Sequence, residues 1–290
     1  MLEENKIING LWIGNSLSCM ELLTMASFIN HGHQFHLWVY DKILTELPSG
    51  VLIKNANDII HESEIFEYEN LCKNNLGKGS VAGFSDLFRY KLLHDVGGWW
   101  VDMDITCLRP FDFTEPYVFP DHDLMPLTGR IMKTPIKCPA MRRAYQETKN
   151  LVDKTNKDWM RPIKILVNQI EVWGLSKYIK RGMTNIDSYI VIQALRHQKI
   201  NIPKEWYAVH WCNEVWRTYG LKKDEVIVES FYGQLMADNE IYFEAKNPTV
   251  SIGKMTVYKI FKFVTERSKL LTQIKAVNQI LNFRIGNWVS

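Results

Sequence analysis

Two acidic residues, Asp102 and Asp104, are the side chains of this sequence most suited to chemistry. They come at the end of the apolar run 99–105, where two like charges are unfavourable unless a cation neutralises them. Carboxylate oxygens without a Cys or His beside them favour Mg²⁺ or Mn²⁺ over zinc, and such ions keep open positions for substrate phosphates. An isolated Asp-x-Asp also occurs on solvated turns, so the elements around the pair decide between these interpretations.

The residues before the acidic pair predict a helix. Apolar side chains recur at helical spacing up to Gly97 and Gly98, which can end the helix in a left-handed turn. Residues three and four apart are neighbours on a helix, so Asp86, Arg89 and Tyr90 are expected to project from one side.

The run 99–105 predicts a strand, because it is aromatic and β-branched where it is not acidic. Alternation gives this strand two faces. One face carries Trp99, Val101 and Met103, and the other carries Trp100, Asp102 and Asp104. Both carboxylates are therefore expected to share one face.

The whole stretch 79–112 resembles the sugar-binding region of glycosyltransferases with a DXD motif, in glycosyltransferase family 32 of OCH1-like and capsule-synthesis enzymes. The residues that carry the resemblance are Ser85, Asp86, Arg89, Tyr90, Gly97, Gly98, Trp100, Asp102 and Asp104. It is more distantly similar to the glucosylating domains of clostridial toxins. The resemblance implies a GT-A fold, an α/β, Rossmann-like fold with a mostly parallel central sheet flanked by helices. It also implies a UDP- or GDP-hexose donor, a divalent metal and transfer that retains the anomeric configuration.

The resemblance further implies roles for individual residues. The expected catalytic residues are Asp102, Asp104, Asp86 and Arg89, and the expected metal ligands are Asp104, His210 and Asp102, the last directly or through water. Contacts with the donor are expected from Trp12, Gly14, Asp86, Arg89, Tyr90, Gly98 and Trp216. A histidine ligand favours Mn²⁺ over Mg²⁺. Two of these positions have a second interpretation. Trp12 can be a core residue, and His210 can be a packed surface residue.

The rest of the chain predicts how the site is built. Strands are expected at 6–13, 34–40, 51–54 and 207–210, with shorter ones at 117–120 and 124–132. A helix is expected from a cap at Ser16 to about Asn30. This alternation predicts a doubly wound parallel sheet, which binds ligands at the carboxyl ends of its strands. Residues 140–182 predict a helical insertion on the acceptor side. A second acidic pair, Asp121 and Asp123, predicts a solvated loop or a contact with the acceptor.

Composition restricts the class of protein. The 290 residues, 46% of them hydrophobic, can bury one large core. A formal charge of +3 is too small to suggest a nucleic-acid partner. Five scattered cysteines without a CxxC pair indicate reduced thiols in a cytosolic protein. The first residues lack the pattern of a signal peptide, and no apolar run is long enough to predict a membrane span.

The tail, residues 251–290, has a different character. It carries seven basic residues and one acid, a balance of +6, so the total of +3 leaves −3 for residues 1–250. Apolar residues are interleaved with these charges, which predicts a basic amphipathic helix that lies on an anionic membrane surface or packs on protein. The glycosyltransferase domain is then expected over residues 1–250.

Together with these patterns, the resemblance implies a metal-dependent retaining glycosyltransferase that moves a hexose to a lipid-linked or oligosaccharide acceptor in bacterial lipopolysaccharide or capsule synthesis. The expected location is cytoplasmic and peripheral on the inner face of the bacterial plasma membrane. A metal-dependent nucleotide-sugar phosphohydrolase and a non-catalytic sugar-nucleotide-binding protein are the alternative functions. The sequence does not give the donor sugar, the linkage or the oligomeric state.

Overall fold

The computed structural model describes residues 1–72, 76–186, 188, 190–191, 200, 202–242 and 244–245. Met1–Lys246 forms one compact unit. The basic tail expected at 251–290 lies outside the described residues. Across the described ranges, no helix combines the length and the apolar character that crossing a membrane requires.

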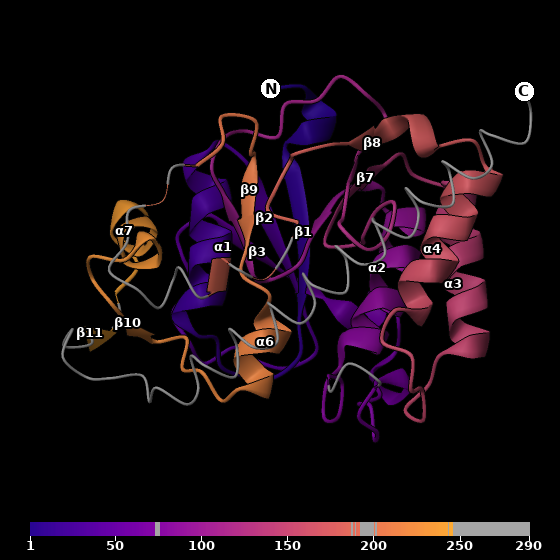
Figure 1. The fold of residues 1–290 in the computed structure, drawn as a ribbon, viewed down its shortest axis with the longest axis horizontal. Coiled ribbons are helices and arrows are strands. Elements are labelled where there is room, and N and C mark those ends of the chain that lie inside the picture. The colour runs from indigo at the N-terminus through magenta and orange to yellow at the C-terminus, as the bar shows by residue number, and fades with distance from the viewer. Residues whose placement is uncertain are drawn as a thin grey trace, which may run out of the picture. The chain divides into compact units, whose positions relative to one another are not determined.

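A five-stranded sheet with the order β3-β2-β1-β4-β7 forms the centre of this unit. Its strands are β1 (Ile7–Trp12), β2 (Gln34–Val39), β3 (Val51–Asn55), β4 (Gly98–Val101) and β7 (Ile131–Thr134). The first four in this order run parallel, whereas β7 is antiparallel to β4. The predicted α/β class with a mostly parallel sheet is confirmed (Figure 1). Because the strand order reverses between β1 and β4, their carboxyl ends flank the crevice where such sheets bind ligands.

Helices cover both faces of this sheet. Figure 1 shows α1 (Cys19–Asn30) on one side and α2 (Ala82–Asp95), α3 (Pro139–Leu151) and α4 (Arg161–Val172) on the other. Alternation along β4 supplies both cores. Trp99 and Val101 pack in a cluster with Phe28 of α1, whereas Trp100 packs in a second cluster with Phe88 of α2. The two faces predicted for these residues are confirmed.

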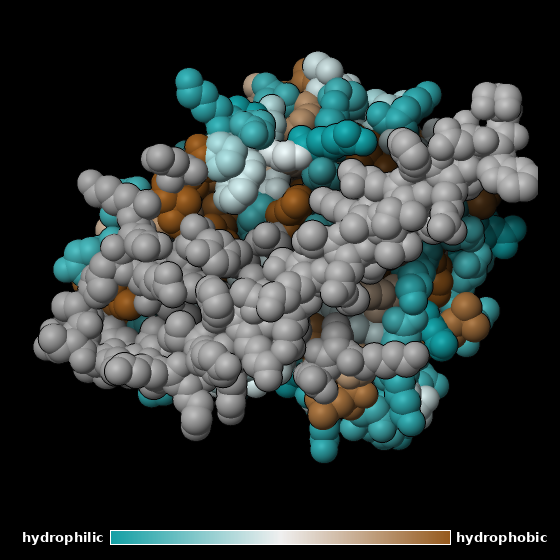
Figure 2. Space-filling model, viewed as in Figure 1, coloured by the Kyte–Doolittle hydropathy of each residue, from teal (hydrophilic) through white to brown (hydrophobic). Residues whose placement is uncertain are grey.

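The helices α3 and α4 fall in the range 140–182 that was expected to be helical. Their buried side chains pack in the same cluster as those of α2. Figure 2 shows mostly hydrophilic residues on the side of the molecule where Figure 1 places these two helices. The amphipathic pattern of α3 and α4 is thus explained, because each helix packs its apolar face in the core that it shares with α2 and exposes its polar face to solvent.

Several short elements complete the unit. The strands outside the central sheet pair as β5 (Ile105–Cys107) with β9 (Ala208–His210), β6 (Phe119–Pro120) with β8 (Ile179–Lys180), and β10 (Glu225–Val226) with β11 (Glu244–Ala245). The short helices are η1 (Glu3–Asn5), η2 (Ala56–Asp58), η3 (Glu62–Glu64), η4 (Ser176–Tyr178), α6 (Asn213–Thr218) and α7 (Phe231–Asp238).

The prediction of a single strand over residues 99–105 is wrong. The structure divides this run into two strands that belong to different sheets. The central strand β4 ends at Val101, the chain turns through residues 102–104, and β5 begins at Ile105. The backbone N–H of Asp102 donates to the carbonyl oxygen of Arg130 at 2.9 Å. A turn allows each carboxylate to reach polar partners, which a continuous buried strand does not provide. The strand expected at 124–132 is also displaced, because β7 begins only at Ile131.

The cap of α1 is Ser18, not Ser16 as predicted. The Ser18 hydroxyl accepts from the backbone N–H of Met20 at 3.3 Å, and the Glu21 carboxylate accepts from the backbone N–H of Ser18 at 2.7 Å. This reciprocal pair requires an acidic residue three positions after the cap, and Glu21 stands in that position only for Ser18.

The two glycines that end α2 are needed for different reasons. Both have left-handed backbones, with φ +72° at Gly97 and +79° at Gly98. A Cβ at Gly97 would lie 2.5 Å from the backbone nitrogen of Ile136, whereas one at Gly98 would come no closer than 3.9 Å to the Ile7 carbonyl oxygen. We expect Gly97→Ala to lower the free energy of unfolding by about 1–3 kcal/mol more than Gly98→Ala does, because only Gly97 adds a backbone clash to the strain. Urea denaturation of both variants measures this difference, and equal losses would contradict it.

Candidate active site

The turn at residues 102–104, which we call the acidic turn, lies at the carboxyl end of β4, beside the point where the strand order reverses. The pairing of β5 with β9 places Ile105 opposite His210. Because Asp104 precedes Ile105, this register brings the imidazole of His210 to the acidic turn. The distance from Nε2 of His210 to Oδ2 of Asp104 is 3.3 Å. The structure therefore assembles this predicted pair through a second, two-stranded sheet.

Asp104 has one carboxylate oxygen engaged and one without a partner. Oδ2 accepts from the backbone N–H of Asn213 at 2.6 Å and faces His210. Oδ1 is buried and has no hydrogen-bond partner in the described part of the chain. The residue is only 6% exposed. Burial opposes its ionisation, but the charge of His210 and the Asn213 N–H together hold the pKa of Asp104 below its ordinary value.

His210 carries the complementary charge. Burial alone would lower the pKa of His210, but the neighbouring Cys212 and Asp104 raise it from 6.5 to about 10. The imidazole is therefore protonated near neutral pH and forms an ion pair with Asp104. The Asn185 side chain fixes this strand by bonding both backbone groups of His210, at 2.8 Å to the N–H and 2.9 Å to the carbonyl oxygen.

Asp102 belongs to a different cluster, centred on the guanidinium of Arg89. Its Oδ1 lies 3.0 Å from Nη2 of Arg89 and accepts from Nε1 of Trp100 at 2.9 Å. Oδ2 lies 3.4 Å from Nη1 of Arg89. The guanidinium also donates to the carbonyl oxygens of Ser85 and Gly129, at 3.2 and 2.8 Å. Both oxygens of Asp102 are thus held in place by protein groups.

Asp86 completes this cluster from α2. Its Oδ1 lies 3.4 Å from Nη1 of Arg89, as the helical spacing of three residues predicts. Burial raises the pKa of Asp86 from 3.8 to about 6, even though the charge of Arg89 opposes that shift. Burial and the nearby charge of Asp102 thus make Asp86 easier to protonate than an ordinary aspartate.

The raised pKa of Asp86 makes stability depend on pH. The folded protein binds this proton more tightly than the unfolded chain, so the stabilisation is complete below the unfolded pKa of 3.8 and is lost as the pH rises through about 6. We expect the stability of the wild type relative to Asp86→Asn to fall by about 3 kcal/mol between these limits, since each pKa unit corresponds to about 1.4 kcal/mol. Urea denaturation of both proteins from pH 4 to pH 7 measures the difference, and a constant difference would contradict the prediction.

The predicted set of three metal ligands is not assembled. In the described residues, no group of three or more His, Cys, Asp or Glu side chains is placed to hold a metal ion. Asp104 and His210 lie together, but Asp102 turns to Arg89 and Trp100. The buried, unpartnered Oδ1 of Asp104 nevertheless fits a direct ligand of a hard cation. The protein thus offers two ligands, an arrangement that suits ions completed by phosphate oxygens and water.

The predicted nucleotide-side residues lie at the end of β1, at the same edge of the sheet as the acidic turn. Trp12 is half-buried, and its indole N–H donates to the Ser16 carbonyl oxygen at 3.0 Å. Gly14 follows with a left-handed φ of +117°. The ammonium of Lys223 lies 5.6 Å from the centre of the Trp12 ring and pairs with Glu21. Its charge also contributes to lowering the pKa of Asp104.

Three predicted donor contacts lie away from the acidic turn or deep in the core. Tyr90 is fully buried and its hydroxyl donates to the Pro162 carbonyl oxygen at 3.1 Å, so it positions α4 against α2. Trp216 is 1% exposed, with its indole N–H donating to the carbonyl oxygen of Trp211. Gly98 begins β4, at the end of the strand opposite to the acidic turn. In the described structure none of the three presents a free group beside Asp102 or Asp104, and their contacts with the donor stay predictions.

The structure adds residues that sequence patterns did not identify. Arg130 is 3% exposed, and its Nε has no hydrogen-bond partner in the described residues. Its carbonyl oxygen accepts from Asp102, which the antiparallel pairing of β4 with β7 brings about. Asn213 and Lys223 reach the site from segments that follow β9. A basic residue before a short strand, such as Arg130, is a weak sequence signal for a functional site. Arg130, Asn213 and Lys223 are also too distant in the sequence for a spacing rule to connect them with the acidic turn.

Comparison with known families gives one match. Residues 19–125 match the family model described as a glycosyltransferase sugar-binding region containing a DXD motif. The matched segment includes α1, α2 and the acidic turn, and it leaves Trp12 and His210 outside. No curated protein matches the sequence.

Two glycosyltransferases are among the solved structures that are similar to this chain. The PaToxG glycosyltransferase has 11% sequence identity and a TM-score of 0.43, with 58% of this chain and 68% of that chain covered. The WbbM bifunctional glycosyltransferase in its apo form has 10% identity and a TM-score of 0.44, with 89% and 52% covered. This chain therefore spans about half the length of WbbM. At these identities and TM-scores neither structure assigns chemistry to individual residues of this chain.

Proposed function

We propose that this glycosyltransferase, whose DXD-containing sugar-binding region spans residues 19–125, moves a hexose from a nucleotide-diphosphate sugar to a glycan acceptor. The observation that carries the proposal is the buried Oδ1 of Asp104, which lacks a hydrogen-bond partner beside His210 in the described residues. An unpartnered carboxylate oxygen is unfavourable in a protein interior. Its position at the reversal of strand order is where a doubly wound sheet binds its ligand.

Asp104 and His210 would hold a divalent cation, with the donor phosphates and water as its other ligands. One carboxylate and one imidazole suit Mn²⁺ better than Mg²⁺. When bound, such an ion stabilises the negative charge that develops on the departing diphosphate. The His210 ring must lose its proton to act as a ligand, and the backbone of Asn213 keeps Oδ2 of Asp104 oriented meanwhile.

The Arg89 cluster would hold the hexose. Asp102 and Asp86 supply carboxylate oxygens, which accept hydrogen bonds from sugar hydroxyls. Arg89 donates to Ser85, Gly129 and Asp102 within the protein, so we assign it the role of orienting the two carboxylates. Retention of configuration follows from the resemblance to the family. Asp86 and Asp102 are both paired with Arg89, which makes neither a free nucleophile, so retention would proceed by front-face attack and not through a covalent glycosyl-enzyme.

The nucleotide would lie at the end of β1. A half-buried indole such as Trp12 can stack on a base, an interaction worth about 1–3 kcal/mol. Lys223, over the Trp12 ring and within electrostatic reach of Asp104, would face the diphosphate between them. The donor base and sugar, UDP- or GDP-hexose, are part of this proposal.

A thermal-shift screen tests this function. UDP- and GDP-hexoses are added with and without Mn²⁺, and one donor is expected to raise the melting temperature strongly only when Mn²⁺ is present. Nucleotide release from that donor is then measured with and without a mixture of saccharide acceptors. If no donor stabilises the protein, or if free sugar is released at the same rate without acceptor, glycosyl transfer is refuted. The second outcome would instead indicate a phosphohydrolase.

We also propose that the protein works at the cytoplasmic membrane on a lipid-linked acceptor, in bacterial lipopolysaccharide or capsule synthesis. The support is the charge of residues 251–290, seven basic residues against one acid. Each basic residue near an anionic surface contributes about 1 kcal/mol to binding. Deleting residues 251–290 is therefore expected to abolish sedimentation with phosphatidylglycerol vesicles at low salt. Equal sedimentation of the truncated and full chains would contradict the membrane role.

A further inference from the structure

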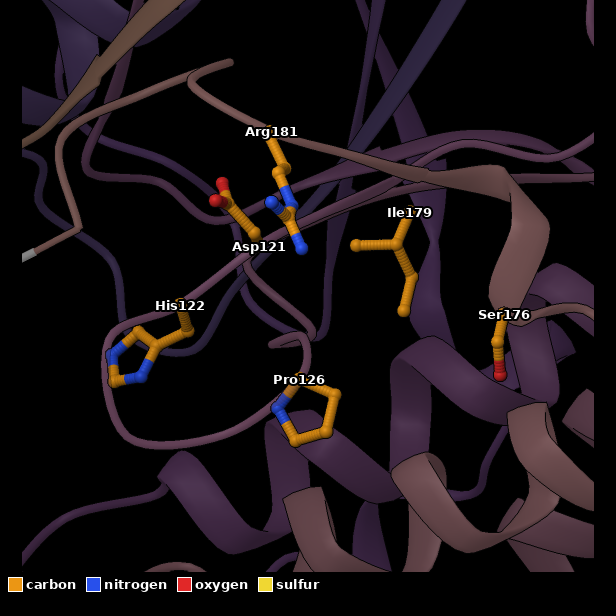
Figure 3. Close-up of a pocket in the computed structure, with 6 residues that line it drawn as sticks. All are labelled: Asp121, His122, Pro126, Ser176, Ile179 and Arg181. Atoms are coloured by element: carbon orange, nitrogen blue, oxygen red, sulfur yellow. The ribbon is translucent and has the colours of Figure 1, made fainter. Parts of the chain in front are cut away.

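A pocket of about 570 Å³ lies outside the residues assigned to the donor. Six residues line it: Asp121, His122, Pro126, Ser176, Ile179 and Arg181. Figure 3 shows them on two segments, with His122 and Pro126 on the loop after β6, and Ile179 and Ser176 across the pocket from them. Its volume falls in the range of pockets that bind small molecules, about 300–1,000 Å³.

The two walls of this pocket are joined at their base. The short strands β6 and β8 pair, with Phe119 opposite Ile179. The backbone N–H of Asp121 donates to the Lys180 carbonyl oxygen at 3.1 Å, and Oδ1 of Asp121 accepts from the backbone N–H of Gly182 at 3.1 Å. Asp121 and Ile179 are thus held together by hydrogen bonds between two segments that are far apart in the chain.

The buried residue Arg130 connects this pocket with the acidic turn. Its carbonyl oxygen accepts from the backbone N–H of Asp102, and its guanidinium donates to the Asp121 carbonyl oxygen, each at 2.9 Å. One residue therefore bonds both to the backbone of Asp102 in the acidic turn and to the backbone of Asp121 in the wall of the pocket.

We propose that this pocket binds the acceptor, and that the acceptor unit it takes is an uncharged saccharide. The inference rests on the proposed glycosyl transfer, since a transferase needs a second substrate beside its donor. Asp121 offers hydrogen-bond acceptors, and Arg181 and Ser176 offer donors. The hydroxyls of a sugar use both kinds of group, while Pro126 and Ile179 provide apolar surface for its C–H groups.

The balance of charge selects the class of ligand. Figure 3 shows Asp121 and Arg181 next to each other on one side of the pocket. An anionic ligand would meet the carboxylate of Asp121, and a cationic ligand would meet the guanidinium of Arg181. A neutral polyhydroxyl compound can bond both side chains without an unfavourable charge, because its hydroxyls donate and accept.

Saturation-transfer NMR on the full-length protein tests the proposal without requiring turnover. The probes are the methyl glycosides of glucose, galactose, mannose and N-acetylglucosamine, with methyl glucuronide and glucosamine as charged comparisons. We expect at least one neutral glycoside to bind, and Arg181→Ala and Ser176→Phe to weaken it at least about tenfold, through a lost charged hydrogen bond and through filled volume. Lys177→Ala removes an exposed charge that does not line the pocket, and it is expected to bind as the wild type does.

The outcomes separate this proposal from the proposed function. If no neutral glycoside binds, if both pocket variants bind as tightly as the wild type, or if a charged probe binds more tightly than every neutral one, the acceptor pocket is refuted. Glycoside binding that is lost in both folded variants supports the pocket even if no nucleotide sugar stabilises the protein. In that case the failure belongs to the donor assignment alone.

Discussion

Replacing Asp104 with asparagine is expected to reduce Mn²⁺-dependent nucleotide release by about a thousandfold, the upper range for loss of one electrostatic contact in a transition state. The reason lies in its two oxygens. Oδ2 is already bonded to Asn213, so Oδ1 is the oxygen left for a cation in the described structure. An amide at this position loses the negative charge and presents either a weaker oxygen or an N–H group to the ion.

The fold should survive this change, because an amide oxygen can still accept from the Asn213 N–H. Circular dichroism checks the fold, and titration with Mn²⁺ followed by electron paramagnetic resonance measures the affinity for the ion. The matched control is Asp95→Asn, which removes a carboxylate that pairs with Lys91 near the end of α2. Unchanged turnover or unchanged Mn²⁺ affinity in Asp104→Asn would remove the central assignment of the site.

Replacing Arg89 with methionine is expected to lower the free energy of unfolding by about 3–5 kcal/mol. Methionine fills similar volume, but it leaves the buried carboxylate of Asp86 and the half-buried carboxylate of Asp102 without their cation. Removal of one partner from a buried ionic cluster costs more than removal of all of them, because unpaired charges stay in the interior. Urea denaturation at pH 7 measures the loss.

A triple variant makes this prediction specific. Changing Asp86 and Asp102 to asparagine together with Arg89→Met removes all three charges, and it is expected to recover most of the lost stability. Donor binding should stay absent in the triple variant, because the proposed hexose contacts are gone. If Arg89→Met is as stable as the wild type, or if the triple variant is no more stable than Arg89→Met alone, the cluster does not have the assigned energetic role.

Local chemistry made much of the fold predictable. The helix before Gly97 and Gly98, the opposite faces of Trp99 and Trp100, and the parallel sheet all follow from periodicity and turn residues. These features depend on neighbours within a few positions, and such neighbours are visible in the sequence. The pairing of Asp86 with Arg89 follows for the same reason, since both lie on one helix.

The site was only partly predictable. The position of His210 beside Asp104 was expected from the resemblance alone, and the structure produces it through the pairing of β5 with β9. The hydrogen bonds of Tyr90 and Trp216 to backbone carbonyl oxygens were not predictable, because a polar group on an aromatic ring can bond to a buried backbone carbonyl as well as to a ligand.

The sequence by itself determined which carboxylates and which guanidinium are candidates, and it determined the helix that carries Asp86 and Arg89 and the strand that precedes Asp102. Only the tertiary structure decided how they divide into two groups, with Asp104 facing His210 and Asp102 facing Arg89. The same holds for Arg130 and Lys223, which reach the site from distant segments. The physical reason is that periodicity fixes the direction of a side chain on its own element. The partner it meets depends on strand order and register, which long-range packing decides.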